Sequence, residues 1–133
     1  MGESPEAVVR SFFAAWEDAT PDGLASFYAA DATYVSSARW ALHGIDAIKA
    51  HYQEQLARGI AGVRIDVKKI VADGPTVMAE RVDTFTFGGK TFEIAAVGVF
   101  EIDGEGRIKR FSDYYDQKSI IDQIEAAGFG VGA

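Results

Sequence analysis

Three charged residues that could transfer protons occur in two stretches of this chain with the pattern of β-strands. Arg81 and Asp83 stand two residues apart in "MAERVDTFTF", and Asp113 lies in "IKRFSDYYDQ". Because side chains alternate along a strand, Arg81 and Asp83 share one face with apolar residues. Those apolar residues are Val77, Ala79, Phe85 and Phe87. An unpaired charge on a buried face costs several kcal/mol, so we expect both charges to have partners, and Asp113 is the obvious candidate.

An arginine placed between two carboxylates suits acid–base chemistry. The guanidinium carries several N–H donors in a planar fork and can contact Asp83 and Asp113 at once. Two carboxylates beside one cation in an apolar pocket tend to share a proton, because desolvation and mutual repulsion oppose full ionisation of the pair. One can then donate a proton while the other accepts one. A structural ion pair between Arg81 and Asp83 is the competing interpretation, and for an isolated Arg-x-Asp it is the commoner one.

The alternation in the later stretch leaves two faces open. The odd positions Phe111, Asp113 and Tyr115 form an aromatic face with a carboxylate in its middle. The even positions compete for the interior; they are Ile108, Arg110, Ser112, Tyr114 and Asp116. Periodicity alone therefore does not decide whether Asp113 points inward.

Three helices are predicted in the first half of the chain. A serine cap followed by proline marks the first start at Ser4, and Phe12 is part of its apolar stripe. A second, shorter helix is expected to begin at Thr20 and to carry residues as far as Tyr28. The third runs from Gly44 and stops near Gly59.

The extended stretches must position the charged residues. "DATYVSS" is predicted to be a short strand that contains Tyr34, and "SSARWALHG" after it a loop with Trp40 and His43. "SIIDQIEAAG" is a plausible terminal helix, and little holds the "GFGVGA" end in place. Four further strands separated by glycine turns are expected near 61–72, 76–88, 91–103 and 106–116.

Helices followed by hairpins predict an α+β fold. We expect a curved, mixed but mainly antiparallel sheet wrapped around the N-terminal helices, which forms a cone with an apolar pocket. The length of 133 residues, with 48% hydrophobic content, is that of one domain, residues 1–133. A net charge of -7 argues against nucleic-acid binding, and no run is long enough to span a membrane. The chain has no cysteine, which excludes disulfides and is typical of a cytoplasmic protein, the location we expect.

Two segments and one tyrosine resemble a known family. "ERVD" (80–83), "GVFEIDGEGRIKRFSDYYD" (98–116) and the upstream Tyr34 are similar to the limonene-1,2-epoxide hydrolases, most strongly over residues 78–117. That family shares its cone-shaped fold with ketosteroid isomerases, dehydratases and SnoaL-like polyketide cyclases. The resemblance implies that Arg81, Asp83 and Asp113 are catalytic and that Tyr34 holds the reacting water.

The implied reaction is the opening of an epoxide by water to give a vicinal diol. Asp83 would protonate the leaving oxygen and Asp113 would take a proton from the water, in one step without a covalent intermediate. The expected partners are a hydrophobic epoxide and water, and no cofactor is implied. One position departs from the family pattern, because Ser36 stands where the family has an asparagine that helps to hold the water. A serine is shorter than asparagine and offers one donor instead of two, so Ser37 or a backbone carbonyl are alternatives to Ser36.

Other functions and sites remain open at this point. An isomerase, dehydratase or cyclase of the same fold would use one aspartate to move a proton beside a carbonyl, and a non-catalytic protein would only bind a small hydrophobic molecule. His43 and His51 have no metal-ligand spacing, so no metal is expected. The aromatic residues Phe12, Phe13 and Trp16 are expected in the core, while Trp40 either closes a pocket or is a packing anchor. The Val- and Phe-rich stretch 92–100 favours a homodimer formed through the sheet.

Overall fold

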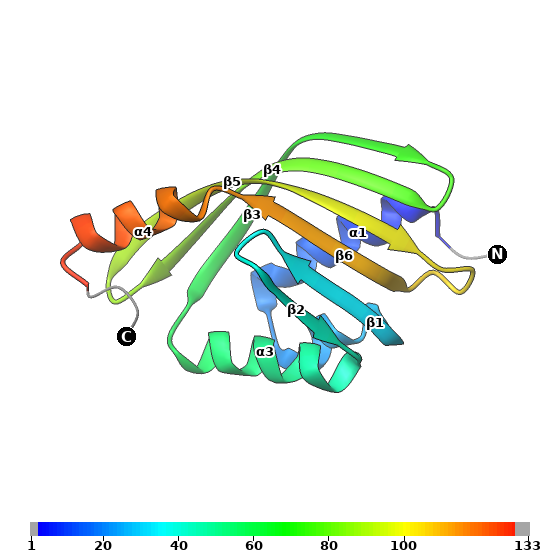
Figure 1. Cartoon of the computed structure of the whole chain (residues 1–133), viewed down its shortest axis with the longest axis horizontal. Coiled ribbons are helices and arrows are strands. Elements are labelled where there is room, and N and C mark those ends of the chain that lie inside the picture. The colour runs from blue at the N-terminus through cyan, green and yellow to red at the C-terminus, as the bar shows by residue number, and fades with distance from the viewer. Residues whose placement is uncertain (1–2, 130–133) are drawn as a thin grey trace.

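The fold is built on one curved sheet of six strands (Figure 1). The computed structural model describes residues 3–129. The helices are α1 (Pro5–Ala14), the short 3₁₀ helix η1 (Ala15–Asp18), α2 (Pro21–Ala25), α3 (Ile45–Ala57) and α4 (Gln117–Ala126). The strands are β1 (Tyr28–Ser36), β2 (Trp40–His43), β3 (Ala61–Asp73), β4 (Thr76–Phe87), β5 (Lys90–Ile102) and β6 (Ile108–Tyr115). Their order across the sheet is β2-β1-β6-β5-β4-β3.

The predicted fold class is confirmed. Neighbouring strands are antiparallel except β1 and β6, which run parallel, so the sheet is mixed but mainly antiparallel. Helix α1 lies behind the sheet in Figure 1 and packs against β3 and β4, while α3 packs against β1 and β2. The sheet therefore bends around the N-terminal helices and leaves a hollow on that side.

The apolar stripe of α1 supplies one half of the core. Its spacing places four side chains on one helix face, where they meet the inner face of the sheet. The core includes Val8, Val9, Phe12 and Phe13 of α1, Tyr28 of β1, Ile48 and Tyr52 of α3, and Val77, Phe100, Ile108 and Phe111 of the sheet. Burial of each such large apolar side chain contributes about 1.5–3 kcal/mol.

Side-chain caps fix the starts of the helices where the sequence predicts them. The Ser4 hydroxyl accepts a hydrogen bond from the Ala7 N–H at 3.2 Å, and the Thr20 hydroxyl accepts one from the Gly23 N–H at 3.0 Å. Proline follows each cap at the first helical position. Each cap satisfies a backbone N–H group that would otherwise lack a partner, and this fixes the residue at which the helix begins.

Tyr28 lies in a strand, which corrects the prediction that it belongs to the second helix. Helix α2 ends at Ala25 and β1 begins at Tyr28. The tyrosine is fully buried, and its hydroxyl is 2.6 Å from the hydroxyl of Tyr52 on α3. In the strand the Tyr28 ring points into the core, and its burial there outweighs the local preference for a helix.

Residues 40–43 form a strand and not the predicted loop, so His43 lies in β2. This strand pairs antiparallel with β1, and Ser36 opposes Trp40 across the turn. Arg39 has φ 72° in that turn, a left-handed conformation that reverses the chain. The strand is too short for alternation to indicate it. Of the "GFGVGA" end, residues 130–133 lie outside the described residues.

Candidate active site

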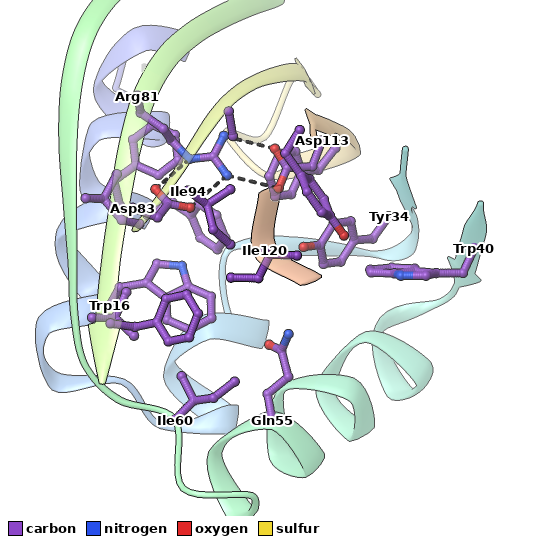
Figure 2. Close-up of a pocket in the computed structure, with 18 residues that line it drawn as sticks. Trp16, Tyr34, Trp40, Gln55, Ile60, Arg81, Asp83, Ile94, Asp113 and Ile120 are labelled. Carbon is purple, nitrogen blue, oxygen red and sulfur yellow. Dashed lines mark hydrogen bonds and ion pairs between the residues drawn. The ribbon is translucent and has the colours of Figure 1, made fainter. Parts of the chain in front are cut away.

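A cavity of about 230 Å³ opens between the inner face of the sheet and the helices (Figure 2). Most of the groups that line it are aromatic or aliphatic, with a small number of polar groups among them. The lining residues are Phe12, Phe13, Trp16, Tyr34, Trp40, Gln55, Ile60, Val63, Ile65, Arg81, Asp83, Phe85, Ile94, Ala96, Phe111, Asp113, Tyr115 and Ile120. An apolar hollow with a few converging polar side chains is the usual form of a small-molecule site.

Three neighbouring strands bring the predicted charges together. Arg81 and Asp83 lie on β4, Asp113 lies on β6, and β5 runs between them. The odd residues of β6 face the cavity, because Phe111, Asp113 and Tyr115 all line it. This resolves the choice between the two faces that periodicity leaves open.

Glycine on the middle strand lets the arginine cross it. Gly98 on β5 is opposite Asp113 in the register. A Cβ atom at this position would lie 2.9 Å from the rings of Phe100 and Phe111 and 3.1 Å from a terminal nitrogen of Arg81. The missing side chain therefore leaves the space that the guanidinium occupies. The sequence reasoning did not assign a role to Gly98, because its importance depends on both neighbouring strands.

The guanidinium of Arg81 binds both carboxylates in pairs of hydrogen bonds (Figure 2). Its Nε and Nη2 donate to Asp83 at 3.0 and 3.2 Å, and its Nη1 and Nη2 donate to Asp113 at 3.0 and 2.9 Å. The arginine is only 4% exposed. Its charge also lies 5.3 Å from the ring centre of Phe13 and 5.9 Å from that of Phe111. These contacts compensate the guanidinium for the water that it loses.

Burial and neighbouring charges shift the pKa values of Arg81 and Asp83. Burial of Arg81 favours its neutral form, but the charges of Asp113 and Asp83 outweigh this effect and raise the pKa of the guanidinium. Arg81 is therefore a permanent cation. Burial raises the pKa of Asp83 above its ordinary value, and the neighbouring Asp113 adds to the increase, while Arg81 opposes it without cancelling it. The cluster holds one carboxyl group that keeps a proton more readily than an exposed aspartate does.

Tyr34 extends from β1 into the same cavity. Its ring stacks on Phe111 at 4.8 Å between ring centres and meets the edge of Trp40 at 5.0 Å. In Figure 2 its hydroxyl points into the hollow. Burial, followed by the influence of Tyr52 and Asp113, raises the pKa of Tyr34 well above its ordinary value. At neutral pH the hydroxyl is thus protonated and can hydrogen-bond to a molecule in the cavity.

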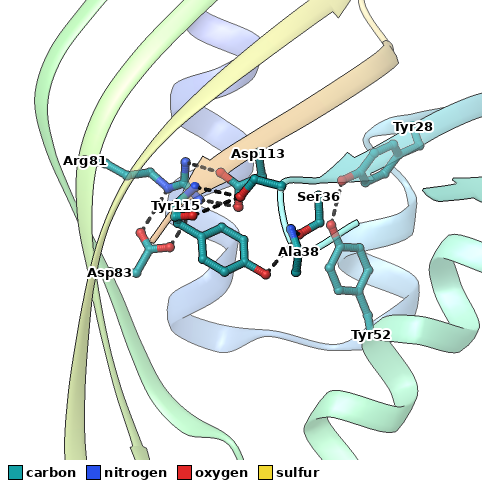
Figure 3. Close-up of polar contacts among 9 residues, drawn as sticks. Tyr28, Ser36, Ala38, Tyr52, Arg81, Asp83, Asp113 and Tyr115 are labelled. Atoms are coloured by element: carbon teal, nitrogen blue, oxygen red, sulfur yellow. Dashed lines mark hydrogen bonds and ion pairs between the residues drawn. The ribbon is translucent and has the colours of Figure 1, made fainter. Parts of the chain in front are cut away.

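Ser36 is buried but is not among the residues that line the cavity. Its hydroxyl donates a hydrogen bond to the Tyr115 hydroxyl at 2.9 Å and accepts one from the Ala38 N–H at 3.1 Å (Figure 3). The structure therefore separates Ser36 from the other four predicted site residues, which all contact the hollow directly.

The structure adds residues to the cavity that sequence reasoning placed elsewhere or did not assign. Phe12, Phe13 and Trp16 line the cavity as well as packing in or against the core, so the prediction of a core role is incomplete. Trp40 also lines it. Tyr115 is on the odd face of β6, whose orientation periodicity leaves open, and the sequence assigned it no role. Its partner is on another strand, and no feature near it in the sequence indicates that contact.

Neither a metal cluster nor a membrane-spanning helix is found in residues 3–129. No group of three or more histidine or acidic side chains in this range is arranged so that it could hold a metal ion. No helix in the same range is long and apolar enough to cross a membrane.

Three solved structures have the same fold as this chain. A Catenulispora acidiphila protein with a ketosteroid isomerase-like fold, determined in complex with trimethylamine, is 26% identical, with a TM-score of 0.80 and 96% of each chain covered. An LEH-like epoxide hydrolase of Mycobacterium tuberculosis is 23% identical, with a TM-score of 0.79, covering 92% of this chain and 90% of that one. A Shewanella denitrificans protein assigned to the SnoaL-like polyketide cyclases is 16% identical, with a TM-score of 0.83, covering 92% of this chain and 97% of that one.

Sequence comparison gives one further relative and the family. A stretch of 59 residues, 44% of this chain, is 37% identical to the epoxide hydrolase EphG of Mycobacterium tuberculosis, and it spans only 39% of that protein. The resemblance to epoxide hydrolases of the limonene-1,2-epoxide hydrolase type is confirmed as a similarity by this relative and by the LEH-like structure. The model of the SnoaL-like domain matches residues 9–111, which is most of the chain, and the chain therefore belongs to the SnoaL-like domain family.

Proposed function

We propose that this protein is an epoxide hydrolase that converts a hydrophobic epoxide to a vicinal diol by direct attack of water. The observation that carries the proposal is the single guanidinium of Arg81, which binds Asp83 and Asp113 together on the wall of an apolar cavity. Proton donation and proton removal can then take place side by side. The similarity to EphG over part of the chain supports the same activity.

Each member of the cluster has a distinct role in this reaction. Asp83, whose raised pKa favours the protonated form, gives its proton to the epoxide oxygen as the C–O bond breaks. Asp113 removes a proton from the water that forms the new C–O bond. Arg81 holds both carboxyl groups in place, and Tyr34 orients the water. The ring strain of the epoxide supplies part of the driving force, and no cofactor takes part.

The cavity fits a small apolar substrate. Its volume is about 230 Å³, and its walls include Phe12, Trp16, Phe85 and Ile94. These side chains bind hydrocarbon and exclude bulk water from the reacting atoms. We therefore propose small cyclic and aryl epoxides as the substrate class.

A single turnover in ¹⁸O-labelled water tests the mechanism. Direct attack places solvent oxygen in the first diol formed, and mass spectrometry of the product measures it. If the first diol carries oxygen from the enzyme, an aspartate acts as nucleophile and the assigned roles are wrong. If no member of an epoxide panel gives a diol although the ligands bind tightly, a non-catalytic binding protein is the better interpretation.

Substitution of each carboxyl group tests the assigned residues. Asp83→Asn and Asp113→Asn should each lower kcat by about 10²–10⁴-fold, the usual contribution of general acid–base catalysis. Asp31→Asn is the matched control, because Asp31 is an exposed aspartate on β1. Near-normal hydrolysis in either site variant would remove that residue from the mechanism.

An isomerase, dehydratase or cyclase of the same fold is the nearest alternative. Such an enzyme would use one carboxylate as its base. The presence of two aspartates bound to the same arginine favours hydrolysis over that alternative. We further propose that two copies of the chain associate through the outer face of the sheet, which carries exposed apolar side chains.

A further inference from the structure

We infer that the Tyr115 hydroxyl donates a hydrogen bond to the reacting water and that Ser36 positions this hydroxyl. The inference rests on the proposed hydrolase function and assigns the role for which the family resemblance implied an asparagine at position 36. Ser36 does not reach the cavity, whereas Tyr115 lines it. The serine thus acts through the tyrosine and not on the water.

The strand register places Tyr115 beside the proposed base. Tyr115 follows Asp113 by two residues on β6, so the two side chains lie on the same face of the sheet. Ser36 is opposite Asp113 in the parallel pairing of β1 with β6, and Tyr34 is opposite Phe111. Tyr34 of β1 and the pair Asp113 and Tyr115 of β6 therefore lie on the same face of two paired strands and line one cavity.

The Ser36 hydroxyl donates a hydrogen bond to the phenolic oxygen of Tyr115. The Ser36 oxygen also accepts the Ala38 N–H, which holds the serine in the turn after β1. That bond leaves the phenolic proton of Tyr115 available, and within residues 3–129 the hydroxyl has no other hydrogen-bond partner. An O–H group whose oxygen accepts a hydrogen bond becomes a stronger donor. Tyr115 therefore presents a polarised donor, and Figure 3 shows its hydroxyl beside Ser36.

The turn after β1 also holds the backbone of Tyr115. The Tyr115 N–H donates to the Ser37 hydroxyl at 3.0 Å, and that hydroxyl donates to the Tyr115 carbonyl at 2.9 Å. The Ser37 N–H donates to the Asp113 carbonyl at 2.9 Å. The backbone at the end of β6 is therefore held on both sides of Tyr114, while the Ser36 hydroxyl holds the Tyr115 side chain.

The side chains of Asp113, Tyr34 and Tyr115 together can complete the hydrogen bonding of an attacking water. A water molecule has two protons and two lone pairs. One proton goes to Asp113, which removes it, and the other is donated to the oxygen of Tyr34. One lone pair accepts the O–H of Tyr115, and the second lone pair forms the bond to the epoxide carbon. The O–H of Tyr115 also stabilises the negative charge that develops on the water oxygen as Asp113 takes the proton.

Kinetics of three variants on an epoxide that the wild-type protein hydrolyses test the inference. Tyr115→Phe should lower kcat about tenfold and leave KM within about twofold, because the lost contact is to water and not to the substrate. Ser36→Ala should lower kcat about threefold. The double variant should match Tyr115→Phe alone, because the serine acts through the tyrosine. Urea unfolding of each variant separates this effect from lost stability.

A conservative variant and three outcomes make the test decisive. Ser36→Thr retains the hydroxyl and should keep the wild-type kcat. A wild-type kcat in Tyr115→Phe overturns the inference while the proposed hydrolase function stands. A further threefold loss in the double variant overturns the positioning role of Ser36. If the wild-type protein gives no diol at all, the proposed function and this inference fall together.

Discussion

Asp83 and Asp113 bind the same guanidinium but differ in their surroundings. Asp83 lies beside Arg81 on one strand, while Asp113 reaches the arginine from across the sheet. Burial raises the pKa of Asp83, which suits the donor of the pair. This asymmetry fits the proposed roles, in which Asp83 donates a proton and Asp113 accepts one.

The pH dependence of hydrolysis tests this asymmetry. Asp83 must be protonated to act as the acid, so kcat/KM should fall as pH rises through its pKa, which lies above the ordinary aspartate value of about 3.9. A pH–rate profile from about pH 4 to about pH 9 measures this limb. A rate that stays constant over the whole range would contradict the role of Asp83 as acid.

Removal of the shared cation should destabilise the fold. In Arg81→Met the two buried carboxyl groups lose their partner, and we expect a loss of about 3–5 kcal/mol in the free energy of unfolding at neutral pH. Arg81 opposes the rise that burial causes in the pKa of Asp83, so in the variant this pKa should lie further above its unfolded-state value. The stability of the variant should therefore decrease as pH rises through the folded-state pKa of Asp83 and should be partly restored in acid.

Urea unfolding at about pH 5 and about pH 8 measures this effect. Arg10→Met is the matched control, because Arg10 is an exposed arginine in an ion pair with Glu6 at the helix surface. Equal stability of Arg81→Met and wild type at both pH values would contradict the account of the cluster.

Alternation along a single strand was enough to predict the inward face of β4. Arg81 and Asp83 lie there as expected, because the period of a strand depends only on local geometry. The contact between Ser36 and Tyr115 was not predictable in this way. It joins residues that are far apart in the sequence, and only the pairing of β1 with β6 reveals it.

At the scale of the elements, β5 lies between β4 and β6, so the Arg81 side chain must cross it to reach Asp113. Gly98→Ala would place a methyl group 2.9 Å from the rings of Phe100 and Phe111 and 3.1 Å from Arg81. Overpacking of this kind typically costs about 1–3 kcal/mol, and it should also displace the guanidinium from Asp113. We expect lower stability by urea unfolding together with a large loss of turnover.

A second glycine provides the control for this substitution. Gly104 lies in the turn between β5 and β6, and a Cβ atom there would meet nothing within 4 Å. Gly104→Ala should therefore leave stability and turnover close to those of the wild-type protein. If Gly98→Ala behaves like Gly104→Ala, the strand does not restrict the path of the arginine.

The elements that the sequence indicated well are those with local signals. Caps and prolines placed the starts of α1 and α2, and glycine turns separated the long strands. Strand β2 and the start of β1 at Tyr28 were missed because tertiary contacts decide them. Propensity is a weak guide where a residue is fixed by a buried partner on another element.

At the scale of the whole molecule, the outer face of the sheet carries the exposed apolar groups. The large hydrophobic side chains exposed there are Val71, Met78, Val97 and Tyr114. They come from four neighbouring strands, and Val97 is opposite Tyr114 in the register. A two-fold axis would place this patch against its own copy.

The dimer is tested by charge introduced into this patch. The variant Met78→Lys/Val97→Lys should sediment as a monomer under conditions where the wild-type chain sediments as a dimer. Gln53→Lys, at an exposed position on α3, should not change the wild-type behaviour. A monomeric wild-type protein in analytical ultracentrifugation would contradict the proposal.

The path of Arg81 across β5 also has a consequence for how the chain folds. The arginine meets Asp113 only when β4, β5 and β6 are aligned as observed. A slip of β6 by one residue would turn Asp113 to the opposite side and leave a buried cation short of a counter-charge. Because such a state is costly, the same three residues that are proposed to open the epoxide also favour the observed alignment of the strands over a slipped one.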